Sequence, residues 1–229
     1  MPYSYCFKCL TLGDVGVGKS CLVLQYTERK FREAHEPTIG GDFGTRIIAT
    51  LDDAGNNNKL IKLQICDMPG NEPARCLTRS CYLGAIAAIL VYDVTNRESF
   101  DHLKALLDDA TAMQLSGNRD NPLTICLVGT IRAVSYEEGE RFAKENGLMF
   151  VEASAKTGHN VDEAFAMIAR AVRRRVEKYG VGGNKSGGGY LDLGAFYGFV
   201  GMPSKGGFGS VGRFLGSCLG SCCFSCGGS

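Results

Sequence analysis

Residues 13–20 read Gly-Asp-Val-Gly-Val-Gly-Lys-Ser, an unbroken G-x-x-x-x-G-K-S pattern. It follows a strand-like run, Cys9-Leu10-Thr11-Leu12, and precedes a helix-like run over residues 21–25. Glycines let a backbone curl until several N–H groups point at one anion, and the following helix adds free N–H groups and its positive dipole end. A plain glycine turn is the alternative, but the strand before and the helix after favour a phosphate-binding loop.

Apolar runs alternate with amphipathic ones along the first 179 residues. The pattern predicts strands near 7–13, 46–51, 60–66, 85–94, 123–129 and 148–153, and helices near 18–28, 75–82, 98–113, 136–146 and 161–178. Such alternation is typical of a mainly parallel sheet that helices cover on both faces. The predicted fold class is therefore α/β, a P-loop NTPase with a six-stranded, mostly parallel sheet flanked by helices.

The composition changes near Gly180. The 50 residues from there onward hold 17 of the 31 glycines, and few of their apolar residues are spaced periodically. We therefore predict one domain over residues 1–179, large enough for a sizeable core, and a disordered tail rich in glycine and cysteine over residues 180–229.

Three helix ends carry recognisable signals. Ser135 and Asn160 each stand three residues before a glutamate, a spacing that predicts capping boxes. The triplet Arg173–Arg175 near the end of the last predicted helix is interpreted as a solvated face. Beside a lipidated tail, the same triplet would also suit anionic lipid headgroups.

Bulk composition excludes several classes of protein. The formal net charge of +1 gives no electrostatic case for nucleic-acid binding. No apolar run approaches the length of a membrane-spanning helix, and the N-terminus has no signal-peptide pattern, so we expect a protein on the cytosolic side. Seven irregularly spaced cysteines from Cys6 to Cys126 suit reduced thiols. An extended strand would place Cys6 and Cys9 on opposite faces, which argues against a metal pair.

Four further segments follow the phosphate loop in order: Glu36-Pro-Thr-Ile-Gly-Gly-Asp-Phe43, Asp67-Met-Pro-Gly-Asn-Glu72, the strand-to-helix stretch 90–100, and Glu152-Ala-Ser-Ala-Lys-Thr157. Together with the loop, they resemble the small GTPases of the Rab family over about residues 5–178. The resemblance is closest to the Rab subgroup of early secretory, ER–Golgi traffic. It implies an enzyme that hydrolyses GTP to GDP and acts as a membrane-tethered switch in vesicle-mediated protein transport.

The resemblance also implies roles for individual residues. Ser20 and Thr38 would ligate Mg²⁺, Asp67 would support the metal through water, and Gly70 would sense the third phosphate. Protein regulators and effectors would bind through residues 36–46 and 67–82. The remaining implied contacts to GTP or GDP are Gly13, Val15, Gly16, Val17, Gly18, Lys19 and Cys21 at the phosphates, and Phe31, Ser154, Ala155 and Lys156 at the base.

Three departures from the family pattern bear on the nucleotide site. Residues 130–133 read Thr-Ile-Arg-Ala where the family has its guanine-reading Asn-Lys-x-Asp, so the carboxylate is missing. Asn71 stands in place of the catalytic glutamine, and Val15 in place of a small or hydroxyl residue. We expect slow hydrolysis and weakened guanine selectivity. The alternatives are a pseudo-GTPase scaffold that binds nucleotide weakly or not at all, and a mis-assembled gene model across residues 130–133.

Four cysteines crowd the last 12 residues. Cys222-Cys223 is recessed from the C-terminus, and Cys226-Gly-Gly-Ser229 has the spacing of a farnesylation site but glycines in its middle. We predict lipidation at Cys222, Cys223 and Cys226, with Cys218 a weaker candidate, against the alternative of an unmodified tail. The expected location is the cytoplasmic face of endomembranes in the ER and Golgi region.

Overall fold

The computed structural model describes residues 3–33, 38, 42–51, 58–70, 82, 84–117, 122–130 and 134–179. These residues form the following elements: β1 (Tyr5–Leu12), α1 (Lys19–Glu28), β2 (Asp42–Thr50), β3 (Lys59–Asp67), β4 (Ala85–Asp93), α3 (Arg97–Asp101), α4 (Leu103–Gly117), β5 (Thr124–Thr130), α5 (Tyr136–Glu145), β6 (Met149–Ala153) and α6 (Val161–Tyr179).

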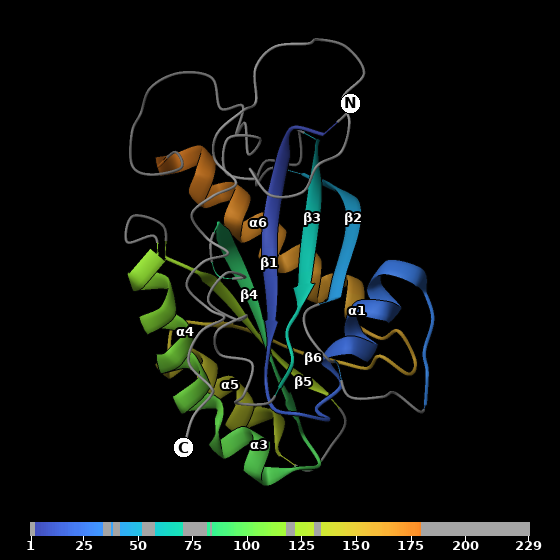
Figure 1. Ribbon diagram of the computed structural model, residues 1–229, viewed down its shortest axis with the longest axis vertical. Helices are drawn as coiled ribbons and strands as arrows, with labels where there is room; N and C mark the ends of the chain where they lie inside the picture. The colour runs from blue at the N-terminus through green and yellow to red at the C-terminus, as the bar shows by residue number, and fades with distance from the viewer. Residues whose placement is uncertain are drawn as a thin grey trace, which may run out of the picture. The chain divides into compact units, whose positions relative to one another are not determined.

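The six strands form one sheet in the order β2-β3-β1-β4-β5-β6 (Figure 1). β2 pairs antiparallel with β3, and the other four pairings are parallel. The carboxyl ends of β1, β3, β4, β5 and β6 therefore lie at one edge of the sheet. Because β1 pairs with β3 on one side and β4 on the other, the loop after β1 leaves from the place where α/β sheets usually bind ligands.

Helices cover both faces of the sheet, as the alternating pattern predicts. α1 and α6 pack on one face, around a core that includes Phe7, Tyr26, Ile65 and Phe165. α3, α4 and α5 pack on the other, around a core that includes Leu10, Tyr92, Phe100 and Leu127. β1 and β4 are buried on both faces, which explains their nearly continuous apolar sequences. The predicted fold class is confirmed.

Element boundaries differ from the predictions in two places. β2 begins at Asp42, four residues before the predicted start, because its backbone pairs with β3 as far as Asp42 opposite Asp67. The helix predicted over 98–113 is divided into α3 and α4 at His102. The helix predicted near 75–82 lies outside the described residues apart from Tyr82.

The two predicted capping boxes have different outcomes. Ser135 caps α5 as expected, since its hydroxyl accepts a hydrogen bond from the Glu138 N–H at 3.3 Å. The prediction for Asn160 is wrong. That residue has a left-handed backbone with φ of 55°, and its side-chain amide donates to the Glu152 carbonyl at 2.9 Å, which ties α6 to β6.

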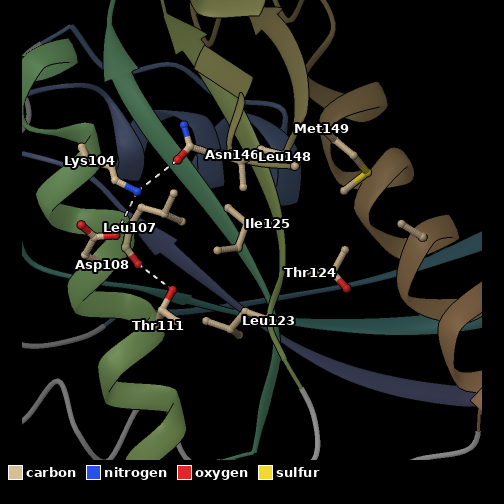
Figure 2. Close-up of a pocket in the computed structure, with 12 residues that line it drawn as sticks. Lys104, Leu107, Asp108, Thr111, Leu123, Thr124, Ile125, Asn146, Leu148 and Met149 are labelled. Atoms are coloured by element: carbon tan, nitrogen blue, oxygen red, sulfur yellow. Dashed lines mark hydrogen bonds and ion pairs between the residues drawn. The ribbon is translucent and has the colours of Figure 1, made fainter. Parts of the chain in front are cut away.

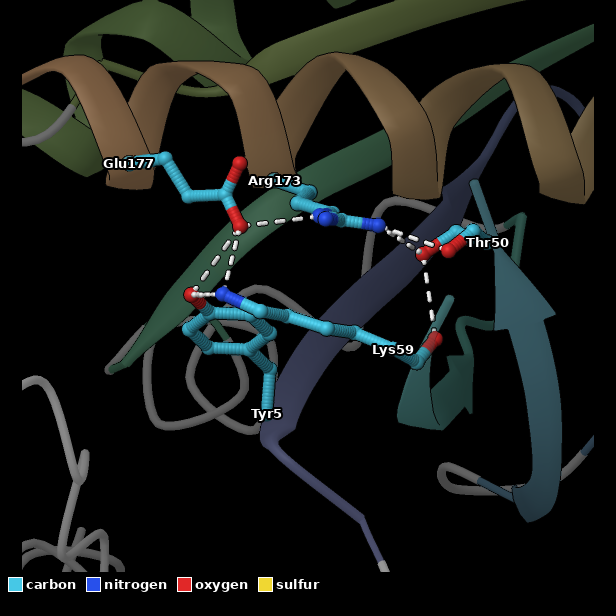
Figure 3. A network of polar contacts seen from close by, with 5 residues as sticks. All are labelled: Tyr5, Thr50, Lys59, Arg173 and Glu177. Carbon is cyan, nitrogen blue, oxygen red and sulfur yellow. Dashed lines mark hydrogen bonds and ion pairs between the residues drawn. The ribbon is translucent and has the colours of Figure 1, made fainter. Parts of the chain in front are cut away.

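The interpretation of Arg173–Arg175 as a solvated face is wrong for two of its three members. Arg173 is only 2% exposed, and its guanidinium donates to the Thr50 carbonyl at 2.6 Å and to Glu177 at 2.9 Å (Figure 3). Arg175 is half-buried and donates to the Ile86 carbonyl at 3.2 Å. Arg174 is exposed. Two of the three arginines therefore attach the end of α6 to the sheet and do not form a surface for lipid headgroups.

The described cysteines are free thiols, as predicted. Cys9 is fully buried in the core beneath α1 and α6, whereas Cys6 is half-buried on the opposite face of β1. Within the described ranges, no three histidine, cysteine or carboxylate side chains lie together as a metal cluster. None of the helices in those ranges has the length and apolarity needed to cross a bilayer.

Candidate functional site

The loop between β1 and α1 has the backbone geometry that an anion site requires. Gly16 and Gly18 have φ of 81° and 92°, in the left-handed region that favours glycine. A Cβ at Gly13 would overlap the Val91 carbonyl of β4, so that position excludes larger residues. α1 begins at Lys19 with no side-chain cap and no acidic residue in its first turn, which leaves its N-terminal N–H groups available to an anion.

The side chain of Lys19 lies across the phosphate loop. Its ammonium group donates to the carbonyls of Gly13 at 2.9 Å and Asp14 at 2.6 Å. The residue is only 6% exposed, and burial lowers the pKa of its ammonium group, while the carboxylates of Asp67 and Asp14 oppose that shift. Lys19 is the residue that the sequence assigns to the outer phosphates. Its ammonium group instead binds two carbonyls of its own loop here.

Three side chains from separate segments bring oxygen atoms that could ligate a metal close together beside the loop. The Ser20 hydroxyl donates to the Asp67 carboxylate and lies 2.8 Å from the Thr38 hydroxyl. Since Ser20 has one proton to donate, Thr38 is the donor in the second contact. Thr11, which the sequence prediction missed, fixes the carboxylate by donating to its other oxygen at 2.8 Å. Two hydroxyls and a carboxylate are hard oxygen ligands of the kind that Mg²⁺ prefers, so the donor set fits the implied metal.

Gly70 and Val15 lie where the sequence places the third phosphate. A Cβ at Gly70 would overlap the backbone nitrogen of Val15 and the carbonyl group of Asp14, so this position also requires glycine. Val15 is 57% exposed at the same point. The two residues that the resemblance assigns to the third phosphate therefore lie side by side. Asn71 lies outside the described residues, as do Cys222, Cys223 and Cys226.

Of the predicted base-binding residues, Phe31 and Lys156 are exposed, whereas Ala155 is buried. Lys156 forms an ion pair with Glu33 at 3.0 Å, and the two side chains are 61% and 82% exposed. This pair joins the segment after β6 to the segment after α1, where Phe31 is 37% exposed. The Ser154 hydroxyl accepts a bond from the Thr157 N–H at 3.2 Å and shapes the turn that carries the buried Ala155. The Cys21 thiol contacts the Arg32 carbonyl at 3.7 Å.

Two residues beyond the predicted set also contact the phosphate loop. The Thr130 hydroxyl, at the end of β5, lies 2.8 Å from the Val17 carbonyl. His102, at the break between α3 and α4, forms an ion pair with Asp14 at 2.8 Å. The sequence holds a signal for Thr130, because a polar residue follows a buried strand at the edge where the loops meet. It holds none for His102, whose contact depends on the break in the helix.

A cavity of about 520 Å³ lies away from this site, at the amino ends of β5 and β6 (Figure 2). Apolar residues such as Leu107 and Ile125 and polar residues such as Thr111 line it together. Lys104 spans its rim through contacts to Asp108 and Asn146, both at 3.2 Å. None of the lining residues belongs to the phosphate loop or the predicted base side.

Comparison with protein-family models gives one finding. Residues 8–174 match the model described as the Ras family. The matched range begins in β1, contains the phosphate loop, Thr38 and Asp67, and ends in α6.

Proposed function

The chain belongs to the Ras family of small GTPases, and from that membership we propose a Rab-like switch that binds GTP and GDP with Mg²⁺ in vesicle traffic. In this proposal the protein hydrolyses GTP slowly and selects guanine weakly. The observation that carries the proposal is the meeting of Ser20, Thr38 and Asp67 beside an intact phosphate loop. Three segments far apart in sequence supply these oxygens, which a chance glycine turn would not bring together.

In this proposal, different described residues bind the phosphates and the metal ion. N–H groups of the loop and of α1 would hold phosphate oxygens, and Lys19 would exchange the Gly13 and Asp14 carbonyls for the outer phosphates. Ser20, Thr38 and Asp67 would hold Mg²⁺, which neutralises charge on the phosphate oxygens when it is bound. Thr38 and Gly70 belong to the two segments whose order would depend on the third phosphate, and this dependence gives the switch its two states.

The slow hydrolysis in this proposal rests on Asn71 and Val15, two positions that the resemblance assigns to the third phosphate. Asn71 is one methylene shorter than the glutamine that orients the attacking water in the family. A misplacement of about 1 Å can cost about 10²-fold in rate. Val15 presents a branched apolar side chain next to Gly70, where it would obstruct an arginine inserted by an activating protein.

Regulators and effectors would bind through residues 36–46 and 67–82. In the described part of these ranges, Phe43 on β2 is 68% exposed, which supports a role in protein contact. Lipids on Cys222, Cys223 and Cys226 would hold the protein on the cytoplasmic face of ER and Golgi membranes. Two modified cysteines are needed for stable anchoring, because a single lipid chain gives the protein only marginal affinity for a membrane.

Isothermal titration of nucleotide-stripped protein tests the proposal. We expect GTP and GDP to bind in the presence of Mg²⁺ and to bind more weakly when it is removed. Ser20→Ala should lose that dependence on the metal, whereas Ser4→Ala, an exposed serine before β1, should retain it. If no nucleotide binds at millimolar concentration, the pseudo-GTPase scaffold replaces the switch.

A further inference from the structure

The cavity of about 520 Å³ lies where β6 is shorter than β5. Pairing between these strands begins at Cys126 opposite Met149, so Thr124 and Ile125 of β5 extend past the start of β6. On their other side, both residues pair with β4. Among the described residues, no strand pairs with Thr124 and Ile125 on the β6 side. The cavity is therefore bounded by the edge of a strand, which is a template for one more extended segment.

The two walls of the cavity come from opposite faces of the sheet. α4 supplies Lys104 on one side, and α6 supplies Ala171 on the other, next to Met149 (Figure 2). The Lys104 side chain is 60% exposed, and its two described partners, Asp108 and Asn146, each lie at 3.2 Å. An ammonium group has three N–H donors, so Lys104 can bind a further acceptor. One wall thus suits an acidic side chain and the other suits apolar ones.

The last turns of α6 bring the start of the tail close to this cavity. The Arg175 guanidinium donates to the carbonyl of Pro122, two residues before β5, and to the Ile86 carbonyl at 3.2 Å. The helix ends at Tyr179, eight residues after Ala171, which is about 12 Å along the helix axis. The ten residues 180–189 span up to about 33 Å when extended. The chain after residue 189 can therefore return to the cavity.

The segment that follows has the residue pattern that the two walls require. Residues 190–193 read Tyr-Leu-Asp-Leu, and Asp192 is the only acidic residue in the 50 residues after Tyr179. Side chains of an extended segment alternate between two faces, so Leu191 and Leu193 share one face and Asp192 takes the other. The alternation of leucine and aspartate matches the apolar wall on α6 and the lysine on α4.

We propose that residues 190–193 dock in this cavity as a short strand beside β5, with Asp192 facing Lys104 and the two leucines facing Ala171. Backbone groups at the edge of β5 supply hydrogen bonds, and the alternating side chains supply the specificity, as in other cases of strand addition. Docking sets the point from which the rest of the tail leaves the domain. The inference does not depend on nucleotide binding.

Amide hydrogen exchange of the full chain tests the docking. Residues 190–194 should exchange about tenfold more slowly than residues 205–212, a part of the same tail that serves as the internal reference. Replacing both leucines, by Leu191→Ser with Leu193→Ser, should make the two rates equal. The slowing should persist on about a hundredfold dilution, because the segment and the cavity belong to one chain.

A charge exchange tests the pair of Asp192 with Lys104. Lys104→Glu and Asp192→Lys should each reduce the slowing from about tenfold to about twofold, as expected for one exposed ion pair. The double variant should restore it. Lys144→Glu, at an exposed lysine of α5, should match the parent.

Three results overturn the inference. The first is equal exchange of residues 190–194 and 205–212 in the parent protein. The second is slowing that Lys104→Glu leaves unchanged, or that the double variant fails to restore, since either would place the segment elsewhere. The third is slowing that disappears on dilution, because it would make a second copy of the chain the partner of this segment.

Discussion

The candidate nucleotide site has two parts: the residues assigned to the phosphates, here called the phosphate side, and those assigned to the base, here called the base side. The two sides differ in how many buried contacts hold their residues in place. On the phosphate side, Lys19 and Asp67 are buried. Lys19 donates to two carbonyls of its own loop, and Asp67 accepts from Thr11 and Ser20, which belong to other segments. On the base side, the described polar contact between segments is the ion pair of Lys156 with Glu33, which is mostly exposed. Exposed ion pairs contribute little to stability or affinity, with a median of about 0–1 kcal/mol.

This difference follows from the sheet. The phosphate loop leaves from β1, the central strand, and its supports Thr11 and Thr130 are themselves parts of buried strands. The base side is formed by segments after α1 and β6, at the periphery of the fold. Without the base-reading carboxylate, the phosphate side would therefore stay intact, and we expect affinity for the nucleotide to persist while selectivity for guanine falls.

Two lysines give the largest contrast between the sides. Lys19→Ala should weaken binding of GTP by about 10²–10⁴-fold, because at least two charge-assisted hydrogen bonds of about 1.5–3 kcal/mol each are lost. Titration with magnesium GTP measures this effect. Lys30→Ala, which breaks an exposed ion pair with Glu28 just after α1, serves as the control. An affinity for Lys19→Ala within threefold of the parent would contradict the assignment of the phosphate side.

The third-phosphate region should show the next largest effect. Asn71→Gln should raise the rate of hydrolysis by about 10²-fold, because the longer side chain brings its amide to the attacking water. Single-turnover release of phosphate measures the rate. Asn71→Ala should be as slow as the parent. A parent rate equal to that of Asn71→Gln would show that another group positions the water.

The base side should respond weakly to the equivalent lysine change. Lys156→Ala should reduce affinity for GTP by less than about fivefold, since an exposed ion pair and its stem contribute about 1 kcal/mol or less. The same titration used for Lys19 gives a direct comparison. A loss as large as that of Lys19→Ala would mean that the base side carries the affinity, and the contrast between the sides would be wrong.

The smallest effect concerns pH at the edge of the phosphate side. The hydrogen bond to Asp14 raises the pKa of His102, and the charges of Glu98 and Asp101 act in the same direction. The resulting stability is fully present below the ordinary pKa of about 6.5, and it is lost as pH rises through the higher pKa of the folded state. His102→Gln should remove this slight fall in the Tm with rising pH, whereas His159→Gln should keep it. Parallel pH profiles for His102→Gln and the parent would contradict the ion pair.

The sequence predicted the features that depend on buried strands and on backbone freedom. The alternating apolar runs located all six strands, and the glycine spacing located the phosphate loop. The sequence did not predict contacts between residues that are far apart along the chain and meet only in the folded protein. Arg173 looks like a surface residue in sequence, yet it is buried because the end of β2 offers the Thr50 carbonyl. Likewise, the Asn160 spacing suits a cap, but the Glu152 carbonyl of β6 takes its side chain.

Competition between GTP, ATP and tripolyphosphate for the nucleotide-stripped protein, in excess Mg²⁺, tests the central claim most directly. The claim is that the phosphate side supplies the affinity and the base side supplies little selectivity. We predict that all three ligands bind, and that GTP is preferred over ATP by less than about a thousandfold, or about 4 kcal/mol. A preference above that value, together with undetectable binding of tripolyphosphate, would show that the base side dominates and would contradict the account.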